Sequence, residues 1–535
     1  MAQEVFTRKA SGLIRVMSPF SAFAYNVLTM SLIFPWVYLW APQIFPGCSL
    51  WLGILLCTFA QVFVSITIAF LASAMPRSGG DYIFQSRIFG GGIGFTSVMS
   101  GFVIWILQWV ALAGWLMAAL GLAPLFLTLG ASIDSPALIA LGKWCFGPTG
   151  IVVISIALTI FVAWFLCTGT RNYVILQYFL FVATLAGFII SLIVLAGLTP
   201  TEFAPKINAF LAKVDGITGS YGSLIGQAKA AGLDLTPKFS FLMTLGVAPL
   251  VWTSLQWASY SVQQGSEIKS AHNLKSQMYI IVGSLTFVGV LLALNGYLFE
   301  KAVGTEYLNA SSAAYNGMIG GEGLGTLLGV NFPSIIVQAI SHPILIILVG
   351  LGFIANSFQI TCNCFIGMTR DMVAMSLDRT LPEWFSKVNP KWHAPTNAYL
   401  AYTIGGIIVI FCYNFVPGWF NLTLGVTFAC GYVFVLSCLS GVFFPSRAKS
   451  IYEASPAAKY GNAIIYTGTI GSIFCGGMVI AFILHPGLRL FSSVPTALFN
   501  VAIIVVAAAI YIAMKSYHAG RGIDITMAFK EIPPE

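Results

Sequence analysis

Charged residues are scarce in this chain, and their scarcity excludes a water-soluble protein of this size. Asp, Glu, Lys and Arg make up 8% of its 535 residues, 58% are hydrophobic, and the mean hydropathy is +0.89. An ordinary soluble domain carries about 25% charged residues, so this chain has too few to cover a surface in water. We therefore predict an all-α integral membrane protein.

Motifs of several enzyme classes are also lacking. There is no G-x-x-x-x-G-K-[ST] phosphate loop and no soluble domain to hold one, so an ATP-driven pump is not expected. There is no H-E-x-x-H, and the five histidines do not cluster, which disfavours a metal or haem enzyme. We therefore predict no enzymatic activity, no metal site and no resident cofactor.

The uncharged intervals predict twelve membrane-spanning helices, because a span needs about 20 apolar residues. The predicted spans are 16–40, 50–75, 95–121, 148–168, 174–198, 239–264, 276–299, 343–369, 396–415, 420–444, 461–485 and 493–515. The first apolar run is too long for a signal peptide, so it is taken as the first span. Within the polar loop 199–238, two segments are expected to form short surface helices.

The distribution of Lys and Arg predicts the orientation. With the N-terminal segment 1–15 inside, most of the 25 Lys and Arg residues fall on the cytoplasmic side, as the positive-inside rule requires. The tail 516–535 then lies inside as well, and the loop 199–238 lies outside. The net charge of +8 therefore requires no nucleic acid partner. We expect a multi-pass protein of the plasma membrane.

The ten cysteines are expected to be mostly free thiols, because most lie within predicted spans. Cys48 and Cys145 fall on outer loops, so a disulfide between them stays open as an alternative.

Two predicted spans have an unusual middle. The span 16–40 contains Pro35, the span 239–264 contains Pro249, and each has a polar patch at mid-depth. Interrupted helices at matching positions of two halves are typical of a transporter site. Pro kinks and Ser or Thr back-bonding also occur in ordinary membrane helices, so this feature alone leaves both interpretations open.

Three charged segments carry a family resemblance. They are "MPRSGGDYIFQSR" (75–87), "SEIKSAHNLKSQ" (266–277) and "TRDMVAMSLDRTLPEWFSKVNPKWHAPTNA" (369–398). In this order and on one side of the membrane, they resemble the loops of the amino acid–polyamine–organocation (APC) transporter superfamily. The residues that carry the resemblance are Pro76, Gly79, Gly80, Tyr82, Arg87, Glu267, Lys269, Arg370, Asp378, Leu381, Pro382, Phe385 and Pro395. Ser270-Ala271 replaces the usual Asn-Pro, and the last two spans match only as apolar helices.

The resemblance implies a leucine-transporter-like fold, a five-plus-five inverted repeat with helices 1 and 6 broken. The repeats would be 16–198 and 239–444, with 461–515 as the two added helices. It implies a secondary active transporter, a permease that moves amino acids or related amines by alternating access. The alternatives that stay open are a non-transporting amino acid sensor or partner protein on the same scaffold, and a channel.

In that family the broken helices present backbone groups to the substrate. Counting back from Pro35 and from Glu267 puts the breaks at about 27–31 and 255–257. The predicted substrate-binding residues are Asn26, Thr29, Met30, Ser31, Gln108, Ser254, Gln256 and Trp257. The first break has no glycine, which indicates a substrate that is bulkier or that lacks an α-carboxylate.

The charged segments are predicted to close a cytoplasmic gate. Gly79-Gly80 predicts a sharp backbone reversal, because Gly tolerates positive φ. Arg77 and Arg87 are expected to pair with acids such as Asp371 or Asp378. The predicted gate residues are Arg77, Asp81, Arg87, Arg370 and Asp378.

The driving ion is predicted from an absence. No Asp, Glu, Lys or His lies at mid-depth in a predicted span, and proton relays usually need such groups. We therefore favour sodium symport or ion-independent exchange over proton symport. The hypothetical sodium site consists of carbonyls of the first span with Ser357 and Thr361 of the span 343–369. The expected partners are the small-molecule substrate and the lipid bilayer.

Overall fold

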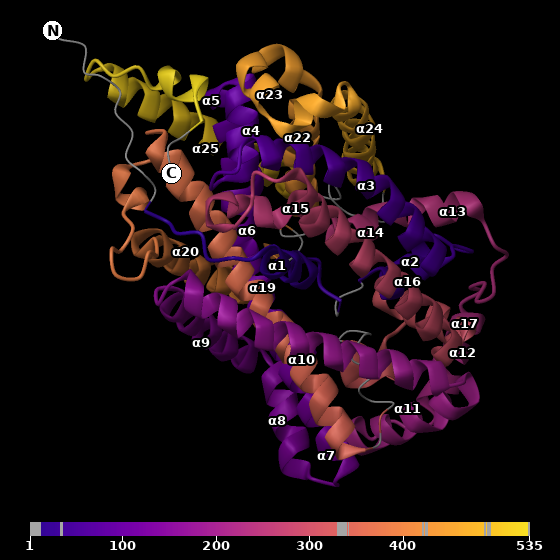
Figure 1. Cartoon of the computed structure of the whole chain (residues 1–535). Coiled ribbons are helices and arrows are strands. Elements are labelled where there is room, and N and C mark those ends of the chain that lie inside the picture. Colours follow the sequence, from indigo (N-terminus) through magenta and orange to yellow (C-terminus); the bar gives the residue numbers. More distant parts are fainter. Residues whose placement is uncertain are drawn as a thin grey trace.

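The computed structural model describes residues 12–32, 36–328, 340, 342–419, 422, 426–485, 488 and 494–532. In these ranges the chain is a bundle of helices, and β pairing is limited to isolated bridges. Figure 1 shows α7, α8, α11 and α12 at one end of the bundle, and α4, α22 and α23 at the other.

The helices fall into two runs along the chain. The first run is α1 (Pro19–Met30), α2 (Trp36–Ile44), α3 (Leu50–Ala74), α4 (Gly80–Phe89), α5 (Gly91–Val98), α6 (Trp105–Trp115), α7 (Ala123–Ser132), α8 (Pro136–Phe146), α9 (Pro148–Leu166), α10 (Thr170–Gly197), α11 (Pro200–Asp215) and α12 (Ser220–Ala230). The second run is α13 (Phe241–Gly246), α14 (Ala248–Leu255), α15 (Leu274–Met278), α16 (Ser284–Val303), α17 (Thr305–Tyr315), α19 (Pro343–Leu377), α20 (Thr396–Phe415), α22 (Val426–Arg447), α23 (Lys449–Ala454), α24 (Ala463–Leu484) and α25 (Val494–Ala519).

Short π and 3₁₀ helices join some of these elements. The π stretches are η1 (Met99–Ile104), η2 (Leu116–Leu122) and η5 (Tyr279–Gly283), and the 3₁₀ stretches are η3 (Gln256–Gln263), η4 (Gly265–Glu267), η6 (Glu322–Leu328), η8 (Glu383–Ser386), η9 (Pro456–Tyr460) and η11 (Ile525–Lys530).

Eleven helices of the described ranges are long and apolar enough to cross a membrane. The predicted first span, 16–40, is not among them, because α1 and α2 are each too short. α1 begins at Pro19, where the Ser18 hydroxyl caps it by accepting from the Ser21 amide. It ends before Ser31, which has a φ of 62°. Pro35, from which the break was counted, lies outside the described residues.

The predicted sixth span, 239–264, changes its helix type along its length. α13 and α14 are α-helical, Pro249 stands in the first turn of α14, and the chain continues from Gln256 as the 3₁₀ helix η3. A 3₁₀ run of 8 residues is unusually long, because such runs seldom exceed four residues. The change of type begins within the predicted interval 255–257.

Two predicted helix ends are wrong. The span predicted as 95–121 is one helical segment from Gly91 to Ser132, so residues 122–132 are helix rather than outer loop. α19 continues to Leu377, about two turns beyond the predicted end at 369. In both places the prediction ended a span where an outer loop or a charge was expected. The helices instead continue to a local breaker, before Asp134 and Arg379, which have φ of 53° and 60°.

The loop 199–238 contains the two expected helices, α11 and α12. Thr199 and Glu202 form a capping box at the start of α11. Hydrogen bonds from Thr199 lower the pKa of the exposed Glu202 carboxyl below its usual value. Gly216, with a φ of 73°, ends the helix. Sequence analysis missed α8, which was assigned to an outer loop.

All ten cysteines are free thiols, so the alternative of a Cys48–Cys145 disulfide is wrong. Burial raises the pKa of the Cys48 thiol to about 12. The thiolate is the reactive form of cysteine, so Cys48 is expected to be inert near neutral pH.

The described core gathers around α1. This helix packs against η3, η5, α10, α16 and α19, and Figure 1 shows it near the centre of the bundle. Segments from both halves of the chain therefore meet at α1, where the chain leaves the helix after Met30.

Close helix packing makes a first prediction. A Cβ on Gly114 of α6 would lie 2.7 Å from the Cα atom of Ser155 on α9. Because overpacking a membrane interior displaces backbone, Gly114→Ala is expected to lower the free energy of unfolding by about 1–3 kcal/mol. Thermal unfolding of the purified protein in detergent measures this. Gly197→Ala, where a Cβ meets nothing within 4 Å, is the matched control, and equal unfolding temperatures for the two variants would contradict the packing argument.

Candidate functional site

Side chains of α19 satisfy the end of α1. The Ser31 hydroxyl donates to Asn356 Oδ1 over 2.7 Å, and Asn356 Nδ2 donates to the Leu28 carbonyl over 3.0 Å. Helix ends leave backbone groups without intrahelical partners, and in lipid those groups find no water. Asn356 therefore satisfies polar groups that are left at the end of α1 inside the protein.

A second contact joins α1 to α19 about two helical turns further along α19. Asn363 Nδ2 donates to the Thr29 hydroxyl over 2.6 Å. Asn363 Oδ1 accepts from Tyr173 of α10 over 3.0 Å and from Gln359 over 2.7 Å. Thr29 is the half-buried member of this group. The dense polar cluster of α19 thus fastens α1 and α10 to it.

Asn26 joins α1 to the second half of the chain. Its Oδ1 accepts from the Ser261 amide over 2.8 Å, and its Nδ2 donates to the Ile280 carbonyl over 3.2 Å. Asn26 is fully buried, and both of these contacts are to backbone. Its amide holds η3 and η5 against α1.

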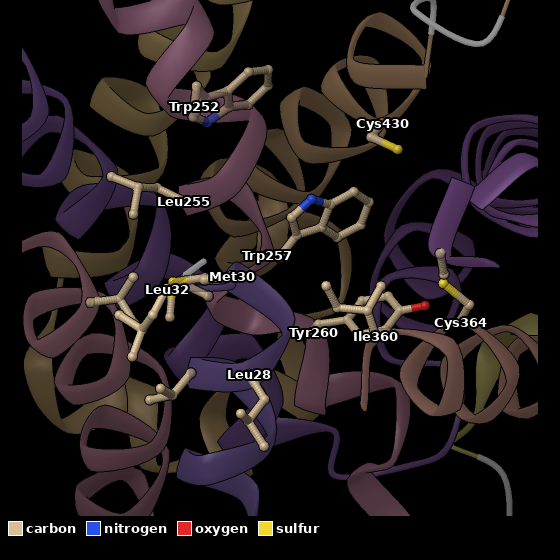
Figure 2. Close-up of a cluster of buried hydrophobic side chains, with 14 of the residues drawn as sticks. Leu28, Met30, Leu32, Trp252, Leu255, Trp257, Tyr260, Ile360, Cys364 and Cys430 are labelled. Carbon is tan, nitrogen blue, oxygen red and sulfur yellow. The ribbon is translucent and has the colours of Figure 1, made fainter. Parts of the chain in front are cut away.

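An apolar and aromatic cluster covers the same point (Figure 2). The Trp257 and Tyr260 rings are 5.4 Å apart and edge-on, and Tyr260 stacks on Tyr25 of α1 at 5.9 Å. The labelled side chains come from α1 and the residues just after it, and from α14, η3, α19 and α22. They are Leu28, Met30, Leu32, Trp252, Leu255, Trp257, Tyr260, Ile360, Cys364 and Cys430. A molecule bound where α1 ends would meet aromatic faces as well as polar backbone.

The 3₁₀ helix η3 carries buried polar atoms that lack partners among the described residues. They are Gln256 Oε1, Ser259 Oγ, Tyr260 Oη, Ser261 Oγ and Gln263 Oε1. Leaving such an atom unsatisfied costs about 1–3 kcal/mol, so a row of five marks a place for water or a polar ligand. Of these residues, sequence analysis selected only Gln256. The run "QWASYSVQQ" was the available signal, since six of its nine residues are Gln, Ser or Tyr.

Several predicted site residues make bonds of their own. Gln256 Nε2 and Trp257 Nε1 both donate to the Thr253 carbonyl, over 3.3 and 2.9 Å. Gln108 accepts instead from Trp419 Nε1 over 2.9 Å, which is the ordinary interhelical bond. Met30 is buried and Ser254 is half-buried.

The predicted ion ligands turn back to their own helix. The Ser357 hydroxyl donates to the Phe353 carbonyl over 3.0 Å, and the Thr361 hydroxyl donates to the Ser357 carbonyl over 3.2 Å. Among the described residues, Asn356 and Asn363 are the α19 side chains that form hydrogen bonds with α1.

Beyond this site lies a group of buried charges, here called the charged layer: Asp81, Arg87, Glu267, Arg370, Asp371 and Asp378. The predicted pairing of Arg87 with Asp378 is present. The guanidinium makes two bonds of 2.6 and 3.0 Å to the carboxylate, and both side chains are 0% exposed. Tyr82 adds a bond of 2.9 Å to Asp378. Gly79, with a φ of 78°, makes the predicted reversal before α4.

A second ion pair of the charged layer was not predicted. Arg370 Nε lies 2.7 Å from Glu267 Oε2, and its Nη2 lies 2.9 Å from Oε1. Thr170 donates to the same carboxylate over 2.5 Å, and Arg370 donates to the Tyr399 hydroxyl. The Glu267 carbonyl also accepts from the backbone amide of Met17. Glu267 stood in a family motif, but was assigned no partner.

The remaining predicted gate residues differ from expectation. Asp81 pairs with no arginine of the described ranges, and accepts from Gln263 Nε2 over 2.7 Å and from the Ser437 hydroxyl over 2.5 Å. Arg77 donates to the Pro76 carbonyl over 3.2 Å. The expected pairing of an arginine with Asp371 is absent, because neither carboxylate oxygen of Asp371 has a hydrogen-bond partner in the described part of the chain.

Comparison with known proteins decides the family. A model of the amino acid permease family matches residues 20–509, a range that includes α1, η3 and the charged layer. The chain belongs to this family. It is an APC superfamily permease with multiple membrane-spanning helices, as the resemblance implied. A search of curated proteins finds no match.

The permease shows no group of three His, Cys, Asp or Glu residues suited to a metal ion across the ranges searched. Its charged layer is instead built from ion pairs between α4 and α19 and between η4 and α19.

The buried ion pair of the permease makes a second prediction. Glu267→Gln leaves the Arg370 guanidinium buried without its counter-charge, so the free energy of unfolding is expected to fall by about 3–5 kcal/mol. Glu453→Gln is the control, because its partner Lys449 is 73% exposed and such surface pairs contribute about 0–1 kcal/mol. Unfolding in detergent measures both variants. Equal stability of Glu267→Gln and the wild-type protein would refute the assigned weight of this pair.

Proposed function

We propose that this permease is a secondary active transporter that moves amino acids or related amines across the plasma membrane by alternating access. The observation that carries the proposal is the end of α1 at Met30 beside the 3₁₀ helix η3. Two helices from different halves of the chain there expose polar groups in a protein interior. Irregular backbone at membrane depth is tolerated where it is buried in protein or lines a cavity.

The two halves are proposed to be inverted repeats over 16–198 and 239–444, with a further helix pair in 461–515. Helices 1 and 6 are then the interrupted helices of their repeats, and their half-helix ends bind the polar groups of the substrate. The proposed contacts are Thr29, Met30 and Ser31 on α1 and Ser254, Gln256 and Trp257 beside them. Asn26 is proposed to position η3 rather than to touch the substrate.

The composition of the site supports an amino acid or amine with an apolar part. Trp257 and Tyr260 provide aromatic faces, which attract ammonium groups, and the orphaned atoms of η3 are acceptors for its donors. The chain has no glycine at the end of α1, so a close approach of a carboxylate to backbone is less favoured there than in relatives that have one. A bulkier substrate, or one without an α-carboxylate, fits this arrangement.

The charged layer is proposed to be the closed cytoplasmic gate. Its two ion pairs are 0–1% exposed, and they join α4, η4 and α19, so opening that side must separate them. With this gate, both chain ends are proposed to lie in the cytoplasm.

The observed length of α19 changes the expectation for the driving ion. Sodium held by α1 carbonyls with Ser357 and Thr361 was favoured because no acid lay within a predicted span. α19 is longer than predicted and carries Asp371 in the protein interior, so that premise no longer excludes a proton. No resident cofactor is proposed.

Counterflow separates transport from the alternatives and gives the third prediction. Proteoliposomes of the full chain, loaded with an unlabelled mixture of amino acids, are expected to accumulate radiolabelled amino acids from outside. Uptake of the same label into liposomes without protein is the blank. A sensor would bind the label without exchanging it, and a channel would equilibrate it without accumulation, so either result would overturn the proposal.

The gate makes the fourth prediction. Arg87→Ala removes the counter-charge of the buried Asp378 carboxylate, which destabilises the closed cytoplasmic side. Counterflow is therefore expected to fall by about tenfold or more, equivalent to about 1.4 kcal/mol. The charge-reversed double variant Arg87→Asp with Asp378→Arg is expected to recover part of that rate. Wild-type counterflow in Arg87→Ala, at equal protein in the vesicles, would exclude a gating role for this pair.

A further inference from the structure

Asp371 is the acid of the charged layer that the described contacts leave unsatisfied. It lies on α19, one residue after Arg370, and is 0% exposed. Neither carboxylate oxygen has a hydrogen-bond partner among the residues described. An ionised carboxylate buried in this way is costly unless it is paired, so its environment requires either a proton or another cation.

The charged groups around Asp371 do not supply that cation. Arg370 and Arg87 are the nearby arginines of the described ion pairs, and they bind Glu267 and Asp378. The group that acts on Asp371 electrostatically is another acid, Asp81 of α4. Asp371 acts in turn on two buried tyrosines, Tyr260 of η3 and Tyr402 of α20. Both tyrosine hydroxyls also lack partners in the described ranges.

The packing around Asp371 is tight. A Cβ on Gly79, at the start of α4, would lie 2.6 Å from the Ala374 Cβ and 3.4 Å from Asp371 Oδ1. One turn earlier on α19, a Cβ on Gly367 would lie 2.5 Å from the Tyr260 hydroxyl. A metal ion requires a shell of several ligand oxygens, whereas a proton requires no additional space. The observations therefore favour a proton.

We propose that Asp371 is the proton-binding site of this transporter. The carboxyl group holds its proton while the charged layer is closed, and when α4 separates from α19 the O–H bond breaks and the proton passes to cytoplasmic water. Substrate release and proton release then share one movement. This inference rests on the proposed function, because it names the ion that drives that transport.

The location of Asp371 supports coupling to the central site. It follows Gly367 by four residues, so both lie on the same face of α19, and Gly367 contacts the Tyr260 ring that stacks on α1. On its other side it faces Gly79, the cap of α4. Asp371 thus lies between the aromatic cluster and the Arg87–Asp378 gate.

A pH gradient tests the proposal and gives the fifth prediction. Proteoliposomes in sodium-free potassium buffer contain a trapped pH-sensitive dye and receive a radiolabelled amino acid mixture. For one-proton symport, an outside pH lower by about one unit is expected to drive about tenfold accumulation, with acidification of the lumen. Asp371→Asn, whose side chain cannot bind and release the proton, is expected to lose both the accumulation and the acidification. Glu453→Gln, an exposed acid, is the matched control and should behave as wild type.

The outcomes separate the inference from the function on which it rests. Counterflow in the wild type without any response to pH would overturn the proton site and leave transport standing. Accumulation that requires sodium and is lost in Asp371→Asn would make sodium the ion and overturn the proton. No counterflow in the wild type would overturn the proposed function.

A measurement without transport tests the site even if Asp371→Asn transports poorly. Infrared spectra of the purified protein are expected to contain the C=O band of a protonated buried carboxyl group. That band should be missing in Asp371→Asn and kept in Glu453→Gln. An unchanged band in Asp371→Asn would overturn the assignment.

Discussion

The Arg370–Glu267 ion pair is the interaction on which the arrangement of this permease most depends. It joins α19 to η4, and its other hydrogen bonds add α10 through Thr170 and α20 through Tyr399. The Glu267 backbone also receives the amides that precede α1. A buried ion pair is stable only when its remaining hydrogen bonds are satisfied, and here they are. The pair therefore fixes where η3 ends, where α1 begins, and how both lie against α19.

At the site, α1 and η3 contain polar groups that are not satisfied by hydrogen bonds within a regular helix. α1 stops at Met30, and Asn356 of α19 donates to the Leu28 carbonyl in its last turn. η3 keeps a tighter turn for 8 residues, and five of its side-chain atoms have no partner in the part of the chain that the structure describes. The first helix end is thus completed by protein, whereas the second is left with acceptors for something else.

The sequence alone predicted the membrane class, most helix bounds and the two regions where helices 1 and 6 are irregular. Apolar length and Pro35, Pro249 and Glu267 carry that information locally. It did not predict that α19 continues past Arg370, because a charge was taken as the edge of a span, and the compensation by Glu267 comes from a distant segment. For the same reason, Asp371 was expected outside the span rather than within α19. Hydrogen bonds such as Gln108 to Trp419 depend on helix rotation, which one sequence does not specify.

The unbroken length of α19 has a mechanical consequence. Its 35 residues make a rod of about 50 Å that carries Asn356 at the end of α1 and Asp378 at the guanidinium of Arg87. Because α19 is one continuous helix, its two ends move together when it tilts. Any tilt of α19 that breaks the hydrogen bond of Asn356 to Leu28 must therefore also shift Asp378. The end of α1 and the charged layer then move together without a relay of intermediate side chains.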